Sequence, residues 1–276
     1  MGRISRTFRL MGESWAVLKQ DRELLLFPVL SSICSLAVIA SFAAPLLLYH
    51  HGAWSDQELQ RTSAQHYGLM FAFYFINFFI ATFFNAAIVA CAARRMEGHN
   101  PTLADGLSAA FTVLHLIFAW AVISATVGLV LRMIEERAPL LMRLLVGALG
   151  MLWSVATFLV VPVLVIEGKG PFQAIGESAS LLKRTWGEQI VGNFSFGVVF
   201  FLLGLPGIAA IALGAMTGLP AGLVPIIAGV VYLVLLGLVN SALHAIYQAA
   251  VYRYAVDGEP PAGFSGESMQ YAMRSR

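Results

Sequence analysis

Long apolar runs, separated by short polar segments, dominate the chain. Six of them are long enough to cross the hydrocarbon layer of a bilayer as a helix, which takes about 20 residues. These runs lie at about residues 24–48, 67–93, 111–131, 139–166, 190–213 and 224–252. Only a cluster of glycines and prolines between Gly214 and Pro225 separates the last two. Such a cluster predicts a turn, so we expect six spanning helices rather than five.

The polar segment before the first run has a different periodicity. Its apolar residues are spaced i, i+4, i+7, i+11 and i+14, at Ile4, Phe8, Met11, Trp15 and Leu18. This spacing predicts an amphipathic helix within residues 1–23. Its other positions carry several arginines. An apolar face with an aromatic residue, flanked by cations, is typical of a helix that lies in the membrane interface and attracts anionic lipid headgroups.

Part of this helix recurs 164 residues later. Gly12-Glu13-Ser14 and Leu18-Lys19 match Gly176-Glu177-Ser178 and Leu182-Lys183. Weaker copies begin at Gly106 and Gly266. The recurrence indicates an internal repeat, which constrains architecture more than activity.

An acidic residue followed by Gly-x-x-Pro ends three of the apolar runs. The copies are Glu97, Gly98 and Pro101; Glu167, Gly168 and Pro171; and Asp257, Gly258 and Pro261. Glycine permits the left-handed conformation that ends a helix, and the proline stops its continuation. We interpret the copies as turns, with a functional site at the acids as the alternative.

Together these patterns predict an all-α polytopic membrane protein. We expect a single membrane domain over 1–276, with six spanning helices arranged as three repeated hairpins and with cytoplasmic interfacial amphipathic helices. The expected segments are an interfacial helix over 1–23, hairpins over about 24–97, 106–167 and 176–257, and a cytoplasmic tail over 258–276.

Composition and charge support this interpretation. The chain is 59% hydrophobic and only 12% charged, whereas about a quarter of the residues in a soluble domain are charged. Of its 17 Lys and Arg residues, all but Arg61, Arg132, Arg137 and Arg143 fall on one side of the predicted spans. Because cations accumulate on the cytoplasmic side, we expect both termini in the cytoplasm. Because this asymmetry accounts for the basic residues, we expect no nucleic-acid partner.

The chain lacks the common catalytic motifs. It contains no His-Glu-x-x-His, no Gly-rich phosphate loop with Lys, no dinucleotide fingerprint and no Gly-x-Ser-x-Gly. We therefore expect no enzyme activity, cofactor or metal. Cys34 and Cys91 lie inside spans and support neither a disulfide nor a zinc site. We interpret His50-His51, near Asp56 and Glu58, as an interfacial pair, with a metal site as the alternative.

The clearest polar signal inside a span lies in the sixth run. Its polar residues are spaced i, i+4 and i+8, at Asn240, His244 and Gln248, with Asn77 and Asn85 of the second run as candidate partners. Because polar groups are costly against lipid, the stripe should face other helices or water. Interhelical hydrogen bonding is one interpretation and a solute path the other.

One stretch resembles a known group. Val160-Val161-Pro162 through Glu167-Gly168, followed by Ser178, Leu182-Lys183 and Trp186, is similar to the pattern of an uncharacterised prokaryotic family of six-helix integral membrane proteins. The ending Ala249 to Gly258 and then Gly263-Phe264 resembles it too. That family is related to the membrane domain of some glycerophosphoryl diester phosphodiesterases. The resemblance implies a six-helix bundle in a bacterial-type cytoplasmic membrane, and we carry over no phosphodiesterase activity.

These observations predict a non-enzymatic membrane protein that organises lipids or partner proteins. The bilayer itself, anionic headgroups and further copies of this chain in a homo-oligomer are its expected partners. The alternative is an oligomeric channel or passive conduit lined by Asn240, His244 and Gln248.

Overall fold

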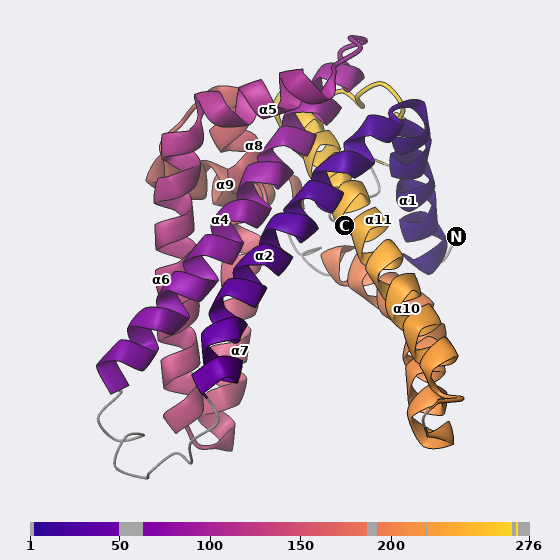
Figure 1. Cartoon of the computed structure of the whole chain (residues 1–276). Helices are drawn as coiled ribbons and strands as arrows, with labels where there is room; N and C mark the ends of the chain where they lie inside the picture. Colours follow the sequence, from indigo (N-terminus) through magenta and orange to yellow (C-terminus); the bar gives the residue numbers. More distant parts are fainter. Residues whose placement is uncertain (1–2, 50–62, 187–191, 219, 267–268, 270–276) are drawn as a thin grey trace. The chain divides into compact units, whose positions relative to one another are not determined.

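The computed structural model describes residues 3–49, 63–186, 192–218, 220–266 and 269. These residues form helices and turns and include no strand (Figure 1). The elements are α1 (Arg3–Gln20), η1 (Arg22–Leu25), α2 (Leu26–Tyr49), α4 (Ser63–Met96), α5 (Leu103–Thr112), α6 (Leu114–Arg137), α7 (Leu140–Ala156), α8 (Val160–Pro162), η2 (Val163–Glu167), α9 (Pro171–Trp186), α10 (Gly192–Thr217) and α11 (Leu223–Asp257). His50-His51, Asp56 and Glu58 lie outside the described residues.

Six segments of the described chain are long and apolar enough to cross a membrane. They are Arg22–Ala44, Gly68–Met96, Leu114–Glu136, Leu140–Glu167, Gly197–Thr217 and Leu223–Asp257. The sequence prediction of six spans is therefore confirmed. The side of the membrane on which the termini lie, the hairpin repeat and the interfacial position of the amphipathic helices stay predictions.

The chain divides into two compact units, which are described separately. One comprises residues 1–28, 91–103 and 180–276, and the other comprises 29–90 and 104–179. The prediction of a single domain over 1–276 stays a prediction.

In the first unit, α1 packs against α11 and α10. Its buried face is formed by Leu10, Ser14, Val17 and Leu18, each less than 9% exposed. Trp15, in contrast, is 39% exposed. The apolar side of α1 is therefore divided, because one part packs inside the unit while the part that carries Trp15 faces outward.

The C-terminal segment of the first unit lies against α1. A Cβ atom at Gly263 would come within 3.0 Å of Val17 Cγ2. Ser265 donates both its hydroxyl and its backbone N–H to Glu13 Oε1, at 2.8 and 3.4 Å. Phe264 and Met269 are buried. The start of the predicted tail is thus a packed part of the unit.

Helices α10 and α11 form a close antiparallel pair at glycine positions. A Cβ atom at Gly229 would lie 2.6 Å from the carbonyl oxygen of Gly207, and one at Gly222 would lie 1.9 Å from that of Gly214. The absence of side chains therefore lets the two backbones touch, as is common between membrane helices. The Tyr232 hydroxyl also donates to Leu203 O at 2.7 Å.

In the second unit, the fourth span is interrupted. Helix α7 ends at Ala156, turns occupy 157–159, and the chain continues through α8 and the π-helix η2. The backbone N–H of Leu159 donates to the Ser178 hydroxyl oxygen of α9 at 3.0 Å. Both residues are fully buried. A side chain of the amphipathic helix α9 thus satisfies a backbone donor that the interruption leaves without a helical partner.

The three acidic-Gly-x-x-Pro copies lie where helices end. Their glycines are left-handed, with φ of 87° at Gly98, 66° at Gly168 and 75° at Gly258. Each follows directly on, or within two residues of, the end of a helix, and α9 then begins at Pro171. The structure therefore explains the recurring glycine by backbone conformation, since residues with a Cβ atom rarely adopt positive φ.

Candidate functional site

The polar stripe of α11 runs from a half-buried position to a buried one. Asn240 is half-buried, His244 is exposed and Gln248 is only 5% exposed. Gln248 lies within a continuous buried stretch from Ala245 to Tyr252. The three side chains share a helix face but not an environment.

The two asparagines of α4 belong to the other compact unit. The Asn77 amide donates to Phe73 O, one turn earlier in its own helix, at 2.9 Å. Asn85 is half-buried. A hydrogen bond to its own backbone satisfies a donor of Asn77 without a second helix, which reduces the cost of placing this amide in a span.

Two of the three repeated acids bind the same arginine. The Arg253 guanidinium of α11 forms an ion pair with Glu97 of the first turn and another, at 3.9 Å, with Asp257 of the last turn. His99 Nδ1 also lies 3.7 Å from Glu97. Arg253 therefore joins the ends of α4 and α11.

The middle acid has a similar arrangement. Lys169 pairs with Glu167 of its own turn and with Glu177 of α9. Hydrogen bonds to the two carboxylates raise the pKa of Lys169 above its usual value, and Glu167 has the larger effect. All three acids thus have a cationic partner within their own unit, which is the arrangement expected of acids with a structural role in turns.

A buried carboxylate lies between α1 and η1. Asp21 is 6% exposed, and its Oδ2 lies 3.6 Å from Arg95 Nε. Arg95 also donates to Asn100 Oδ1 at 2.8 Å and to Gln20 O at 3.1 Å. Burial raises the pKa of the Asp21 carboxyl above 3.8, and the Arg95 guanidinium opposes part of this shift.

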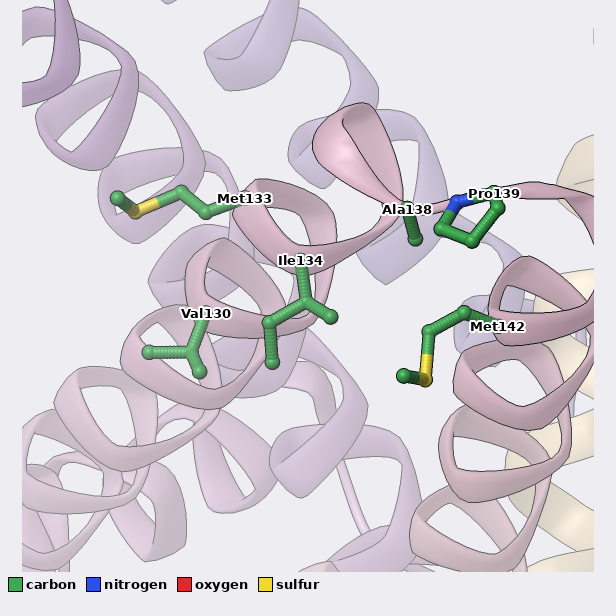
Figure 2. A pocket seen from close by; sticks show the side chains of 6 residues that line it. All are labelled: Val130, Met133, Ile134, Ala138, Pro139 and Met142. Atoms are coloured by element: carbon green, nitrogen blue, oxygen red, sulfur yellow. The ribbon is translucent and has the colours of Figure 1, made fainter.

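The loop between α6 and α7 is flanked by two cavities within the second unit. The first has a volume of about 500 Å³ and is lined by apolar residues: Val130, Met133, Ile134, Ala138, Pro139 and Met142. Figure 2 shows Val130 and Ile134 on one helix and Met142 on the next, with Ala138 and Pro139 in the connection between them. Among the described residues of this lining, none has a charged or hydrogen-bonding side chain to orient a ligand.

The second cavity, of about 700 Å³, combines small and charged residues. Its lining comprises Gly128, Leu131, Arg132, Glu135, Glu136, Arg143, Val146, Gly147 and Gly150. Arg132 Nε lies 3.1 Å from Glu136 Oε1, and Arg132 also donates to the Tyr74 hydroxyl. Arg143 Nε donates to Ala138 O at 3.0 Å. We call this space the α6–α7 cavity.

Metal ligation finds no support in the described part of the chain. No group of three His, Cys, Asp or Glu side chains there is placed to hold an ion. Cys34 is exposed and Cys91 is buried, and neither forms a disulfide with a described residue.

A comparison with family models places the chain among known sequences. The model of a family of unknown function, DUF6159, matches residues 64–264, which is well over half of the chain. The chain belongs to this family. No curated protein and no solved structure matches it. DUF6159 covers the chain from α4 to α11, so α1 and the first span lie outside the matched segment.

Membership of DUF6159 agrees with the resemblance to an uncharacterised membrane family. The relation to the membrane domain of glycerophosphoryl diester phosphodiesterases stays a prediction.

Sequence reasoning missed the cations that bind the repeated acids and the charged α6–α7 cavity. One signal was present, because Arg253 stands four residues before Asp257, a spacing that brings side chains together on a helix. The pairs Asp21–Arg95 and Glu97–Arg253 join distant segments, so only the fold brings them together.

Proposed function

We propose that this DUF6159 protein is a non-enzymatic multi-pass membrane protein that organises lipids, with α1 as the element that holds anionic headgroups at the cytoplasmic surface. The divided apolar side of α1 is the observation that carries this proposal. One part of it is buried in the unit, and Trp15 is exposed.

The surroundings of Trp15 support an interfacial position. Lys19 Nζ lies 5.8 Å from the centre of the Trp15 ring, and Lys19 and Arg22 are both exposed. An exposed indole beside cations suits the boundary between acyl chains and anionic headgroups. Helix α9 has the same division, because Ala174, Ser178 and Leu182 are buried whereas Phe172 is 78% exposed.

Packing of α1 against α11 and the Glu13–Ser265 hydrogen bonds hold the helix in one orientation. A rigidly held basic helix gathers anionic lipid at a defined place, whereas a free one would only tether the chain. Partner proteins that recognise the same surface would be organised by the same helix.

The experiment measures lipid enrichment around the full chain in vesicles that contain a fluorescent anionic lipid. In a chain whose other four tryptophans are replaced by phenylalanine, energy transfer from Trp15 reports lipid within reach of α1. Each surface cation contributes about 1 kcal/mol to anionic-lipid attraction, so the double variant Lys19→Gln/Arg22→Gln should lower the local enrichment by a factor of roughly 30. Glu259→Gln, an exposed change elsewhere in the unit, is the control. Equal enrichment around the unchanged protein, the double variant and the control would contradict the proposal.

Flux measurements separate this proposal from the channel alternative. Purified protein in liposomes should give the same ion and solute flux as empty liposomes over a range of pH, voltage and membrane tension. Flux that His244→Leu or Asn240→Leu alters would instead establish a conduit lined by the α11 stripe.

A further inference from the structure

The α6–α7 cavity has the size and position of a lipid site. Its volume of about 700 Å³ falls within the range of about 300–1,000 Å³ typical of ligand pockets. The two spans that border it end at Glu136 and begin at Leu140. The charged residues of the lining are therefore near the membrane boundary, while the glycines lie deeper in the spans.

Charge pairing inside the cavity is incomplete. Arg132 and Glu136 form an ion pair with each other. Arg143 and Glu135, which line the same cavity from α7 and α6, have no ion-pair partner among the residues that the structure describes. Arg143 donates one of its five N–H groups to Ala138 O, and this hydrogen bond holds its side chain in place.

A ligand with one charge of each sign complements this pair. A phosphate would accept hydrogen bonds from Arg143, and an ammonium group would donate to Glu135. A headgroup with a net negative charge satisfies Arg143 but leaves Glu135 beside a like charge. A quaternary ammonium has no N–H to donate, so a primary ammonium fits better.

The glycines provide room for an acyl chain. A Cβ atom at Gly128 or Gly147 would meet no atom within 4 Å. The missing side chains therefore leave open space that continues from the charged groups into the apolar part of the spans.

We propose that the α6–α7 cavity binds one phospholipid with a phosphoethanolamine headgroup, its phosphate on Arg143 and its ammonium on Glu135. This site is separate from the anionic-lipid surface of α1, so either proposal can fail without the other.

The test is native mass spectrometry of the full chain, extracted with equal amounts of phosphatidylethanolamine, phosphatidylcholine and phosphatidylglycerol. The intact protein should retain phosphatidylethanolamine at least about fivefold over the other two, because a charge-assisted hydrogen bond favours the matching headgroup by about that factor or more. Equal retention of the three lipids would overturn the proposal.

Two kinds of variant locate the bound lipid. Gly147→Leu fills the open space and should remove the retained lipid, whereas Gly237→Leu, at an α11 glycine that also has open space around it, should keep it. Retention by Gly147→Leu equal to that of the control would place the lipid elsewhere and refute the assignment. Thermal unfolding of both variants verifies that they fold.

Glu135→Gln and Arg143→Gln test the headgroup without changing the size of the cavity. Glu135→Gln should abolish the preference for ethanolamine over choline, and Arg143→Gln should reduce retention of all three lipids. A preference that survives in Glu135→Gln would exclude the ammonium contact. Soluble phosphoethanolamine should fail to displace the lipid, and displacement would show a headgroup site without an acyl chain.

Discussion

Two serines of the recurring Gly-Glu-Ser sequence lie inside the protein, within α1 and α9. Ser14 and Ser178 occupy the same position of the repeated Gly-Glu-Ser sequence, and both are fully buried. Ser178 accepts a hydrogen bond from the Leu159 backbone, whereas the Ser14 hydroxyl has no hydrogen-bond partner among the described residues. The two serines are thus alike in burial but differ in hydrogen bonding.

Asp21 should make stability depend on pH. Burial raises its folded pKa above 3.8, so between 3.8 and that raised value the folded state binds more protons than the unfolded state. Stability relative to Asp21→Asn should therefore fall as the pH rises through this window. Thermal unfolding in detergent, measured from pH 3.5 upward in steps of about half a unit, reports the difference between the two proteins.

The exposed change Glu259→Gln serves as the control for Asp21→Asn, since it removes a carboxylate without burial. A stability difference that instead grows with pH would mean that attraction to Arg95 outweighs desolvation.

At the scale of elements, the repeated turns are defined by their glycines. Gly168 has φ of 66°, and no atom lies near the position of its missing Cβ. Gly168→Ala should therefore destabilise the protein by about 1–2 kcal/mol through backbone conformation alone. Gly168→Asn should cost less, because asparagine tolerates the left-handed region. Chemical denaturation in mixed micelles gives these differences.

Gly176→Ala provides the matched comparison. This glycine lies within α9, also with open space around it, and alanine there should stabilise the helix by about 0.5–1 kcal/mol. If both alanine variants change stability in the same direction, the conformational explanation of the turn glycines is wrong.

Sequence patterns predicted the elements better than their contacts. Apolar length predicted the six helices that are long enough to span a membrane, and the glycines of the acidic-Gly-x-x-Pro copies are left-handed at helix ends, because both features depend on local properties. The i, i+4 spacing gave α1 but grouped Trp15 with Leu18 on one apolar face. The structure buries Leu18 with Leu10 and exposes Trp15. Periodicity does not distinguish apolar surface that packs on protein from apolar surface that meets lipid.

Candidate site residues were harder to predict than elements. The stripe of Asn240, His244 and Gln248 follows from spacing, yet their different exposure depends on which helices pack against each part of α11. The α6–α7 cavity is lined by residues of two different helices. No single-helix pattern contains that information.

For the whole molecule, orientation in the membrane is the main testable feature. The excess of Lys and Arg on one side predicts that Asn100 and Glu259 face the cytoplasm and Pro139 the opposite side. Single cysteines at these exposed positions, introduced after Cys34→Ala and Cys91→Ala, should react with an impermeant maleimide from opposite sides. Labelling of Asn100→Cys from outside intact cells would reverse the assigned topology.

The hydrogen bond between Leu159 and Ser178 also bears on the order in which the chain is built. An unsatisfied backbone donor in hydrocarbon costs several kcal/mol. Ser178 is synthesised 19 residues after Leu159, so the fourth span carries this donor unsatisfied until α9 has left the ribosome. The fourth span should therefore reach its final position in the bilayer only after α9 has been synthesised. Helix α9 would then contribute to membrane insertion of the span that precedes it.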